Sequence, residues 1–576
     1  MILSLWGIPP GSQGRRMFFS KKKHRSSMKP VLYDDEECIR VVKGTSNRIE
    51  QLTGVGSLRL AIVLSAMVFM FMYFMFVFGG PGCGVLYSCK HSDDEAFRQA
   101  EELNRAIEAQ DDLERDMVRY LDDDLPPMQE EQQPFHSSIA PSHEPEKGSS
   151  PAPGYETGLA NIVFGIAASA KLWEKRQEYV KLWWRPGEMR GFVWLDKAVS
   201  SWSKALPPMR ISEDTAKFNY TNKKGGRSGI RISRVVSETF RQNLTDVHWF
   251  VMGDDDTMFV PENLVRILSK YDHRKFYYIG SHSESHTQNI HFSYNMAYGG
   301  GGFAISYPLA KALAKVQDRC IMKYPYLYGS DDRIQACLSE LGVPLTKEPG
   351  FHQVLSLFSW QFDIYGDAFG LLAAHPVTPL VSIHHLDLID PVFPNTTQIE
   401  ALRHFKSSMR VDPGGVLQQS ICYDKYKRWS ISVSWGYAVQ VYRGILPPRL
   451  LELPMRTFLS WYRRMDDIGF PFNTRPFLKS PCEQPTIFYM KEVGYGDEAG
   501  ETISSYSRDR RQRGGGECKS TLQHSPGSLE EIIVTKEQAD DSWHLAPRRQ
   551  CCRVVKSTKK MIEVSVGNCE SGETII

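Results

Sequence analysis

The chain has 576 residues, more than one ordinary domain holds, so we expect one large or two smaller folded units with appended segments. The formal net charge is only +2 and no long basic stripe runs along the sequence, so we exclude nucleic acid as a partner. Aromatic residues make up 11% of the chain, a content that suits stacking on carbohydrate and equally suits a large apolar core.

An uncharged apolar run at residues 60–78 (LAIVLSAMVFMFMYFMFVF) predicts a membrane anchor. A helix of that length reaches about 28 Å, close to the hydrocarbon thickness of a bilayer, about 30 Å. The run is longer than the apolar part of a signal peptide and follows a long polar segment, so we expect it to be retained. Basic residues precede the run and acidic residues follow it. The positive-inside rule then predicts a cytoplasmic tail at residues 1–59 and a luminal remainder.

Two further patterns fit a luminal location. The triplets that begin at Asn219, Asn243 and Asn395 are acceptors for N-glycosylation, although such triplets also arise by chance. Ten of the eleven cysteines follow the apolar run, and only Cys38 precedes it. Disulfides are therefore allowed in the luminal part, but their pairing cannot be read from the sequence.

Residues 79–154 are expected to form a luminal stem. Within it, the charged segment 93–123 favours a helix with apolar residues at roughly heptad spacing. Gln110 and Glu114 interrupt that seam, which favours a solvated helix, and a homodimer through the stem stays an open alternative. Residues 124–154 are rich in Pro, Ser, Glu and Gln, the composition of an extended linker.

From residue 155 the composition becomes globular, and strand patterns alternate with helix patterns. Buried strands are expected at 162–167, 191–195 and 247–252, and helices at 171–184 and from Pro261 onward. Charged residues follow the strand ends, as in an open α/β sheet that binds ligands at the carboxyl ends of its strands. We therefore expect an α/β domain over residues 155–415. The alternating run at 429–442 predicts a strand pair, so residues 416–576 are interpreted as a smaller β-rich accessory region.

Three adjacent carboxylates, Asp254, Asp255 and Asp256, directly follow the third predicted strand. Because they repel one another, they need either a cation or full solvation. Hard oxygen ligands suit Mg²⁺ or Mn²⁺, and such an ion in turn holds diphosphate oxygens. The alternative is a solvated turn that caps the next helix. The position at the end of a buried strand favours metal binding.

Three other features are candidates for chemistry. The acidic pair Asp331 and Asp332 opens an amphipathic helix, where one carboxylate could cap the helix and the other could act as a general base. Four glycines at 299–302 permit close backbone approach to a ligand, but they lack the spacing of a nucleotide-binding motif and could form only a flexible turn. His352, in GFHQ, is either a structural residue or a metal ligand.

In chain order, VHWFVMGDDDTMF, YGGGGFAIS, YGSDDRIQACLSELGVPLT and GFHQ resemble the Fringe-like members of glycosyltransferase family 31. The runs GLLAAHPVTPLVSIHHLD and RRQCC resemble the plant Fringe-related branch. The resemblance covers roughly residues 155–555. It implies a nucleotide-sugar-binding α/β sandwich of the GT-A type in a Golgi membrane enzyme. It also implies that the enzyme transfers a sugar from a UDP-sugar to a glycan, glycoprotein or glycoside, with inversion and in β-1,3 linkage. The implied cofactor is Mn²⁺ or Mg²⁺.

The resemblance also implies roles for single residues. Asp256 matches the direct metal ligand, with Asp254 beside it, and His352 matches the downstream histidine that completes the metal site. Asp332 matches the catalytic base, and Asp331 is the second choice for that role. The residues expected to hold the nucleotide-sugar are Asp254, Asp255, Arg176, Gly300 and Gly301.

One segment departs from the resemblance. Similar sequences run from GFHQ directly into FDIYG, whereas residues 354–361 (VLSLFSWQ) intervene here. We interpret this insertion as a splice variant or retained intron, which sequencing of the transcript would test, and it could displace His352.

Two other functions remain open. A non-catalytic luminal carbohydrate-binding or scaffold protein on the same fold would not need both acidic clusters. A metal-dependent luminal hydrolase would be expected to offer histidines near Asp254, and the sequence shows none there. The donor sugar and the acceptor are set by pocket shape, so motifs do not identify them.

Overall fold

The computed structural model describes residues 156–200, 202–353, 364–460, 470–477, 480, 482–510 and 525–575. All of these belong to one of the two compact units of the chain, the one from Ala100 to Ile576. The predicted tail, anchor and stem and the insertion at 354–361 lie outside the described residues. No helix among the described residues is long and apolar enough to span a membrane.

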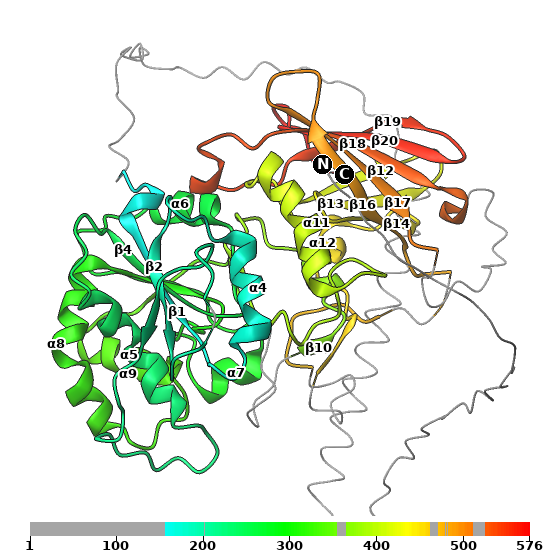
Figure 1. Cartoon of the computed structure of the whole chain (residues 1–576). Coiled ribbons are helices and arrows are strands. Elements are labelled where there is room, and N and C mark those ends of the chain that lie inside the picture. Colours follow the sequence, from blue (N-terminus) through cyan, green and yellow to red (C-terminus); the bar gives the residue numbers. More distant parts are fainter. Residues whose placement is uncertain are drawn as a thin grey trace, which may run out of the picture. The chain divides into compact units, whose positions relative to one another are not determined.

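A mixed seven-stranded sheet forms the N-terminal part of this unit, with strand order β3-β2-β1-β4-β7-β6-β8 (Figure 1). Its strands are β1 (Ile162–Ala167), β2 (Arg190–Leu195), β3 (Met209–Ile211), β4 (Trp249–Asp254), β6 (Tyr278–Gly280), β7 (Phe303–Ser306) and β8 (Leu345–Lys347). Only β7 runs against its neighbours, β4 and β6. The α/β sheet predicted from the sequence is confirmed, and the three predicted strands correspond to β1, β2 and β4.

Helices cover both faces of this sheet because the side chains of its strands alternate. In β1, Phe164 and Ile166 enter one apolar core, while Val163 and Ala167 enter another. The helices are α4 (Trp173–Trp183), α5 (Ser228–Phe240), α6 (Pro261–Leu268), α8 (Tyr307–Lys323) and α9 (Asp331–Glu340). α4 and α6 supply the first core, and α5, α8 and α9 supply the second. Both predicted helices are present, and α6 begins at Pro261 as expected.

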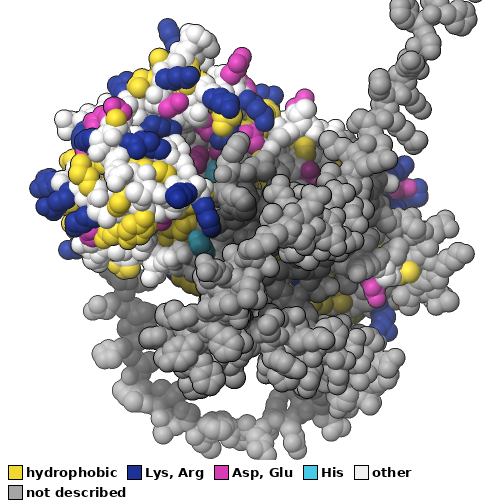
Figure 2. Space-filling view, turned by 90° about the horizontal axis from the view of Figure 1, so that it is seen from below, with side chains coloured by type: hydrophobic (Ala, Val, Ile, Leu, Met, Phe, Trp, Pro, Cys, Tyr) yellow, Lys and Arg dark blue, Asp and Glu magenta, His cyan; other side chains and the backbone are white. Residues whose placement is uncertain are grey.

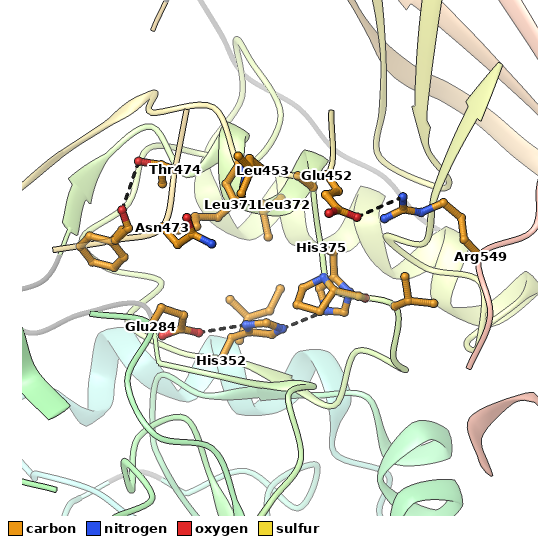
Figure 3. A pocket seen from close by; sticks show the side chains of 16 residues that line it. Glu284, His352, Leu371, Leu372, His375, Glu452, Leu453, Asn473, Thr474 and Arg549 are labelled. Atoms are coloured by element: carbon orange, nitrogen blue, oxygen red, sulfur yellow. Dashed lines mark hydrogen bonds and ion pairs between the residues drawn. The ribbon is translucent and has the colours of Figure 1, made fainter. Parts of the chain in front are cut away.

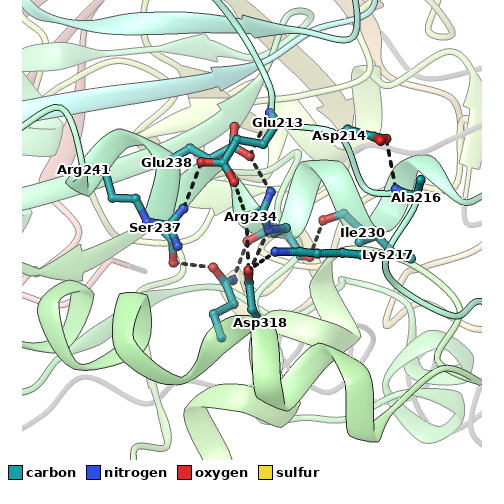
Figure 4. Close-up of polar contacts among 12 residues, drawn as sticks. Glu213, Asp214, Ala216, Lys217, Ile230, Arg234, Ser237, Glu238, Arg241 and Asp318 are labelled. Atoms are coloured by element: carbon teal, nitrogen blue, oxygen red, sulfur yellow. Dashed lines mark hydrogen bonds and ion pairs between the residues drawn. The ribbon is translucent and has the colours of Figure 1, made fainter.

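A buried arginine fixes the helices of the second face. Arg234 on α5 is 1% exposed, and its guanidinium contacts Glu238 at 2.9 Å, Glu213 at 2.6 Å and Asp318 of α8 at 2.9 Å (Figure 4). Burial raises the pKa of Glu238 to about 7 despite the opposing charge of Arg234. Three carboxylates around one cation compensate the cost of burying it, so the network holds α5 against α8.

A second sheet of eight strands follows, with order β12-β13-β14-β16-β17-β18-β20-β19. Its strands are β12 (Gln419–Asp424), β13 (Trp429–Ser434), β14 (Ala438–Arg443), β16 (Thr486–Tyr495), β17 (Glu501–Arg508), β18 (Glu531–Glu537), β19 (Cys551–Ser557) and β20 (Met561–Gly567). All neighbours are antiparallel except β18 and β20. The β-rich character predicted for this region is confirmed, and the predicted strand pair is β13 and β14.

The two edge strands of the second sheet meet. Cys422 of β12 forms a disulfide with Cys552 of β19, and the hydroxyl of Ser557 donates a hydrogen bond of 2.6 Å to Asp424. The sheet therefore curls until its first and last strands lie against each other. Further disulfides join Cys551 to Cys569 and Cys320 to Cys337.

One apolar core runs through both sheets, since Phe164 of β1 and Val441 of β14 belong to the same cluster of buried residues. Helix α11 (Gln398–Val411) contacts both α4 and β16. Just after this helix, Asp412 accepts a 2.7 Å bond from Lys536 of β18, and both side chains are at most 5% exposed. The predicted boundary between residues 415 and 416 thus falls inside a continuous core. On the face shown in Figure 2, lysine and arginine side chains of the described part are scattered among neutral and acidic ones.

Candidate functional site

The aspartate triplet lies at the carboxyl end of β4, in the middle of the first sheet. The side chain of Asp254 is 32% exposed, whereas those of Asp255 and Asp256 are 3% and 1% exposed. The backbone N–H of Asp254 donates to the hydroxyl of Thr257 at 2.9 Å, which stabilises the turn that follows the strand. One carboxylate therefore faces solvent and two are buried below it.

Arg176 of α4 compensates the two buried carboxylates. Its guanidinium nitrogens lie 2.8 Å from Oδ1 of Asp255 and 3.0 Å from Oδ2 of Asp256, and a third contact of 2.8 Å reaches Asp387. Burial opposes the charge of Arg176, but Asp256 and Asp255 outweigh it and raise the pKa of the guanidinium. Arg176 was predicted to bind the nucleotide. In this structure it forms ion pairs with two aspartates of the triplet.

Two histidines that follow β11 (Ser382–Ile383) lie beside the aspartate triplet. Nε2 of His384 lies 3.2 Å from Oδ1 of Asp256 and 3.5 Å from Oδ2 of Asp254. One ligand atom each from Asp256, His384 and His385 lie within 4.8 Å of one another. Burial disfavours charge on His384, but Asp256 and Asp254 outweigh this effect and raise its pKa to about 9. Burial lowers the pKa of His385, so this ring stays neutral and free to bind a metal.

His385 is also unusual in its backbone. Its φ is 57°, in the left-handed region that residues other than glycine rarely adopt. Such conformations cost of order 1–3 kcal/mol and are concentrated at binding and catalytic sites.

The donor atoms of this cluster fit a divalent metal. Both carboxylate oxygens of Asp256 and Nε2 of His384 are buried and form ion pairs with Arg176 or with each other. Nδ1 of His385 is buried and has no hydrogen-bond partner among the described residues. Buried polar atoms of this kind are costly unless they are bonded or bind a cation. One carboxylate with two imidazoles suits Mn²⁺ better than Mg²⁺, which prefers oxygen ligands. We name Asp254, Asp255, Asp256, His384 and His385 the acidic cluster.

The glycine run at 299–302 packs against the acidic cluster. A methyl group added at Gly300 would lie 1.9 Å from Cε1 of His384. One added at Gly299 would lie 2.6 Å from Oδ1 of Asp331. Glycine is needed here because side chains of the candidate site approach the backbone closely, which the sequence had suggested for a ligand.

Asp332 stabilises the turn before α9. Its carboxylate accepts hydrogen bonds from the backbone N–H groups of Tyr328 at 2.6 Å and Gly329 at 3.0 Å. The side chain is buried, and burial raises its pKa although Arg333 opposes the shift. Both oxygens of Asp332, predicted to be the base, are therefore engaged by its own loop.

Asp331 lies closer to the acidic cluster. Its Oδ1 accepts a 2.9 Å hydrogen bond from the hydroxyl of Ser330 and lies beside Gly299. Burial and then the charge of Asp254 raise the pKa of Asp331 to about 7. The geometry thus separates the two carboxylates, with Asp332 holding the turn and Asp331 near the charge of Asp254.

His352, at the end of β9 (Phe351–His352), belongs to another group of side chains. Its Nδ1 lies 3.0 Å from Oε1 of Glu284, and its Nε2 lies 2.9 Å from Nε2 of His375. Both ring nitrogens are therefore engaged away from Asp256. The role of His352 as a metal ligand stays a prediction. Its neighbour Gln353 does reach the acidic cluster, with Oε1 3.1 Å from Nδ1 of His384.

His384 and His385 are candidate metal ligands that were not predicted from the sequence. Their signal was present, because two consecutive histidines end an apolar run in VSIHHLD. The expectation that no histidine lies near Asp254 is wrong, since the fold brings His384 to it from a distant part of the chain. That argument against a hydrolase therefore no longer holds.

The fold and the acidic cluster together define a mixed α/β protein with a candidate metal centre at the carboxyl ends of its central strands. Residues 157–361 match the family model described as Fringe-like, and residues 288–552 match one described as protein of unknown function, DUF604. The match over residues 157–361 confirms the Fringe-like resemblance found in the motifs of this part of the chain.

Two relatives are named beta-1,3-glucosyltransferase. The mouse protein is 29% identical over 119 residues, which cover 21% of this chain and 23% of the mouse protein. The human protein is 32% identical over 105 residues, which cover 18% and 20%. The chain thus spans less than a quarter of the length of these relatives. Among solved structures, apo mouse xyloside xylosyltransferase 1 matches 32% of this chain and 82% of its own. The identity is 8% and the TM-score is 0.21.

Proposed function

We propose that the chain is a type II Golgi membrane glycosyltransferase. It transfers a sugar from a UDP-sugar to a hydroxyl of a glycan, glycoprotein or glycoside, with inversion and with a divalent metal. The observation that carries the proposal is the acidic cluster at the carboxyl end of β4 in a Fringe-like chain. The names of the mouse and human relatives make UDP-glucose and a β-1,3 linkage the first to test. The plant Fringe-related branch and the anchor at 60–78 stay predictions.

Asp256, His384 and His385 would hold the metal, because one ligand atom of each lies within 4.8 Å of the others and Nδ1 of His385 has no hydrogen-bond partner among the described residues. A bound ion would supply positive charge at the departing diphosphate. Asp254, the exposed carboxylate of the triplet, is available to hydroxyls of the donor sugar. Arg176 offsets the charge of the buried pair below, so that the site can hold three adjacent carboxylates.

We propose Asp331, in place of Asp332, as the catalytic base. Inversion requires a group that removes the proton of the attacking acceptor hydroxyl. Both oxygens of Asp332 already accept backbone N–H groups, whereas Asp331 lies beside Gly299, next to the loop that packs on His384. Its pKa of about 7 makes Asp331 basic enough to accept a proton and ionised in part at neutral pH.

The test is UDP release by the full chain in lipid nanodiscs, over a panel of UDP-sugars, with Mn²⁺ or with EDTA. We expect metal-dependent release from one donor and transfer of its sugar to an acceptor. Asp331→Asn should lower turnover by about 10²–10⁴-fold and leave UDP binding intact, which would separate catalysis from folding. Equal turnover in this variant would refute the assignment of the base.

Two outcomes would favour the alternatives. Release of free sugar at the rate of UDP, with or without an acceptor, would indicate a hydrolase. Failure to bind UDP in Mn²⁺, together with binding of glycans, would indicate a carbohydrate-binding or scaffold protein.

A further inference from the structure

A cavity of about 470 Å³ lies apart from the acidic cluster (Figure 3). Its volume is in the range of sites for small molecules, about 300–1,000 Å³. Its walls are mainly apolar, with Leu371, Leu372 and Val377 from the sequence before α11 and Leu453 and Phe472 from the sequence after it. We call it the rear cavity.

A pair of strands separates the rear cavity from the acidic cluster. β9 and β11 are parallel, and His352 lies opposite Ile383. These two residues line the cavity. Side chains alternate along a strand, so the following residues, Gln353 and His384, point to the other face, where they contact each other at 3.1 Å. The rear cavity is therefore a site of its own.

A chain of hydrogen bonds fixes the protons at one end of the cavity. Nδ1 of His375 lies 2.7 Å from the carbonyl oxygen of Pro376, which can only accept, so this nitrogen carries a proton. Burial keeps His375 neutral, as the lowered pKa of its ring indicates. Nε2 of His375 must then accept a proton from Nε2 of His352, at 2.9 Å. Nδ1 of His352 in turn contacts Oε1 of Glu284 at 3.0 Å.

Each acidic side chain of the cavity lies beside a basic one. Glu284 contacts His352, and Glu452 lies 3.7 Å from Arg549. An uncharged ligand fits such a lining, because a charged one would lose hydration without a counter-ion. Two buried side-chain atoms of the lining residues have no hydrogen-bond partner among the described residues, the acceptor Oε2 of Glu284 and the donor Nε of Arg549.

We propose that the rear cavity binds an uncharged, mainly apolar small molecule with a hydroxyl group, an alcohol or a phenol, whose O–H donates to Oε2 of Glu284. The apolar walls bury the body of the ligand, and the hydroxyl donates to the carboxylate oxygen of Glu284 that has no partner among the described residues. The site is distinct from the acidic cluster and does not depend on the transferase activity.

Three probes of one shape test this proposal in calorimetric titrations of the full chain in lipid nanodiscs. They are 2-naphthol, naphthalene, which lacks the hydroxyl, and 2-naphthoate, which is charged. We expect 2-naphthol to bind about three- to tenfold more tightly than naphthalene, the worth of one hydrogen bond, and 2-naphthoate to bind most weakly. Equal affinities for 2-naphthol and naphthalene, or tightest binding of 2-naphthoate, would overturn the proposal.

Variants locate the binding. Leu371→Trp fills the cavity and should abolish binding of 2-naphthol, while Ile503→Trp, at a position 45% exposed on β17, is the matched control and should retain it. Glu284→Ala should keep naphthalene binding and lose the preference for 2-naphthol, and retention of naphthalene binding shows that this variant is folded. Binding of 2-naphthol to Leu371→Trp as to the unaltered chain would place the probe elsewhere and refute the site.

Discussion

Gly300→Ala tests whether the glycine run exists to make room for the acidic cluster. The added methyl would lie 1.9 Å from Cε1 of His384 and 2.3 Å and 2.4 Å from its two ring nitrogens. Contacts this short cannot persist, so either the ring or the loop must move. The ring is itself held by Asp256 at 3.2 Å and by Gln353 at 3.1 Å, so its displacement breaks the cluster.

The size of the effect follows from this crowding. Overpacking a well-filled region costs about 1–3 kcal/mol of the free energy of unfolding. Displacing a group that holds or orients a metal typically lowers metal affinity by about 10–100-fold. Gly301→Ala should be milder, because its methyl would lie 3.2 Å from the backbone of His352 and Gln353 and touch no ring of the cluster.

Calorimetric titration with Mn²⁺ in the presence of UDP, together with urea unfolding, measures both quantities. Gly494→Ala is the matched control, because no atom lies within 4 Å of its added methyl, and it should bind Mn²⁺ like the unaltered chain. Unchanged Mn²⁺ affinity in Gly300→Ala would refute the reasoning. If Gly300→Ala and Gly301→Ala lost affinity for UDP equally, the result would instead support the sequence-based view that the glycine run approaches a ligand.

Three further predictions concern Asp331, Asp332 and a buried ion pair. Because a base must be ionised and the pKa of Asp331 is raised to about 7, kcat/KM should rise with pH and level off above about 7. A profile that is flat down to pH 5 would contradict this. Asp332→Ala should lower the free energy of unfolding by about 1–3 kcal/mol, since two backbone N–H groups lose their acceptor, and a urea midpoint equal to that of the unaltered chain would contradict it. Lys536→Met should cost about 3–5 kcal/mol in urea unfolding because Asp412 stays buried without its partner, whereas Lys491→Met, at an exposed pair, should cost under about 1 kcal/mol; equal costs would refute the assignment.

Local patterns in the sequence were sufficient for the elements that carry the acidic cluster. The predicted strand at 162–167 coincides with β1, and the helix predicted from Pro261 is α6. Both depend on residues that are neighbours in the sequence, a run of buried apolar side chains and a proline whose fixed φ suits the first helical turn. The aspartates after β4 were found for the same reason, since they directly follow a strand pattern.

The rest of the candidate site depends on pairing between distant segments. His384 and His385 reach Asp256 because β11 pairs with β5 (Met258–Phe259) on one side and with β9 on the other. No local pattern specifies those partners. The sequence also could not decide between Asp331 and Asp332 as the base. Consecutive residues at the start of a helix point about 100° apart, and only the packing of α9 determines which one faces the acidic cluster.

The bond between Cys422 and Cys552 sets an order for the synthesis of this protein. The two cysteines are 130 residues apart. At about 5–20 residues per second, the first edge strand waits roughly 7–26 s after its own synthesis before its partner emerges. Until then the outer edge of β12 is uncovered and can bind chaperones or a neighbouring nascent chain. Closing the sheet is therefore a late step of folding, and a chain truncated before Cys552 cannot complete it.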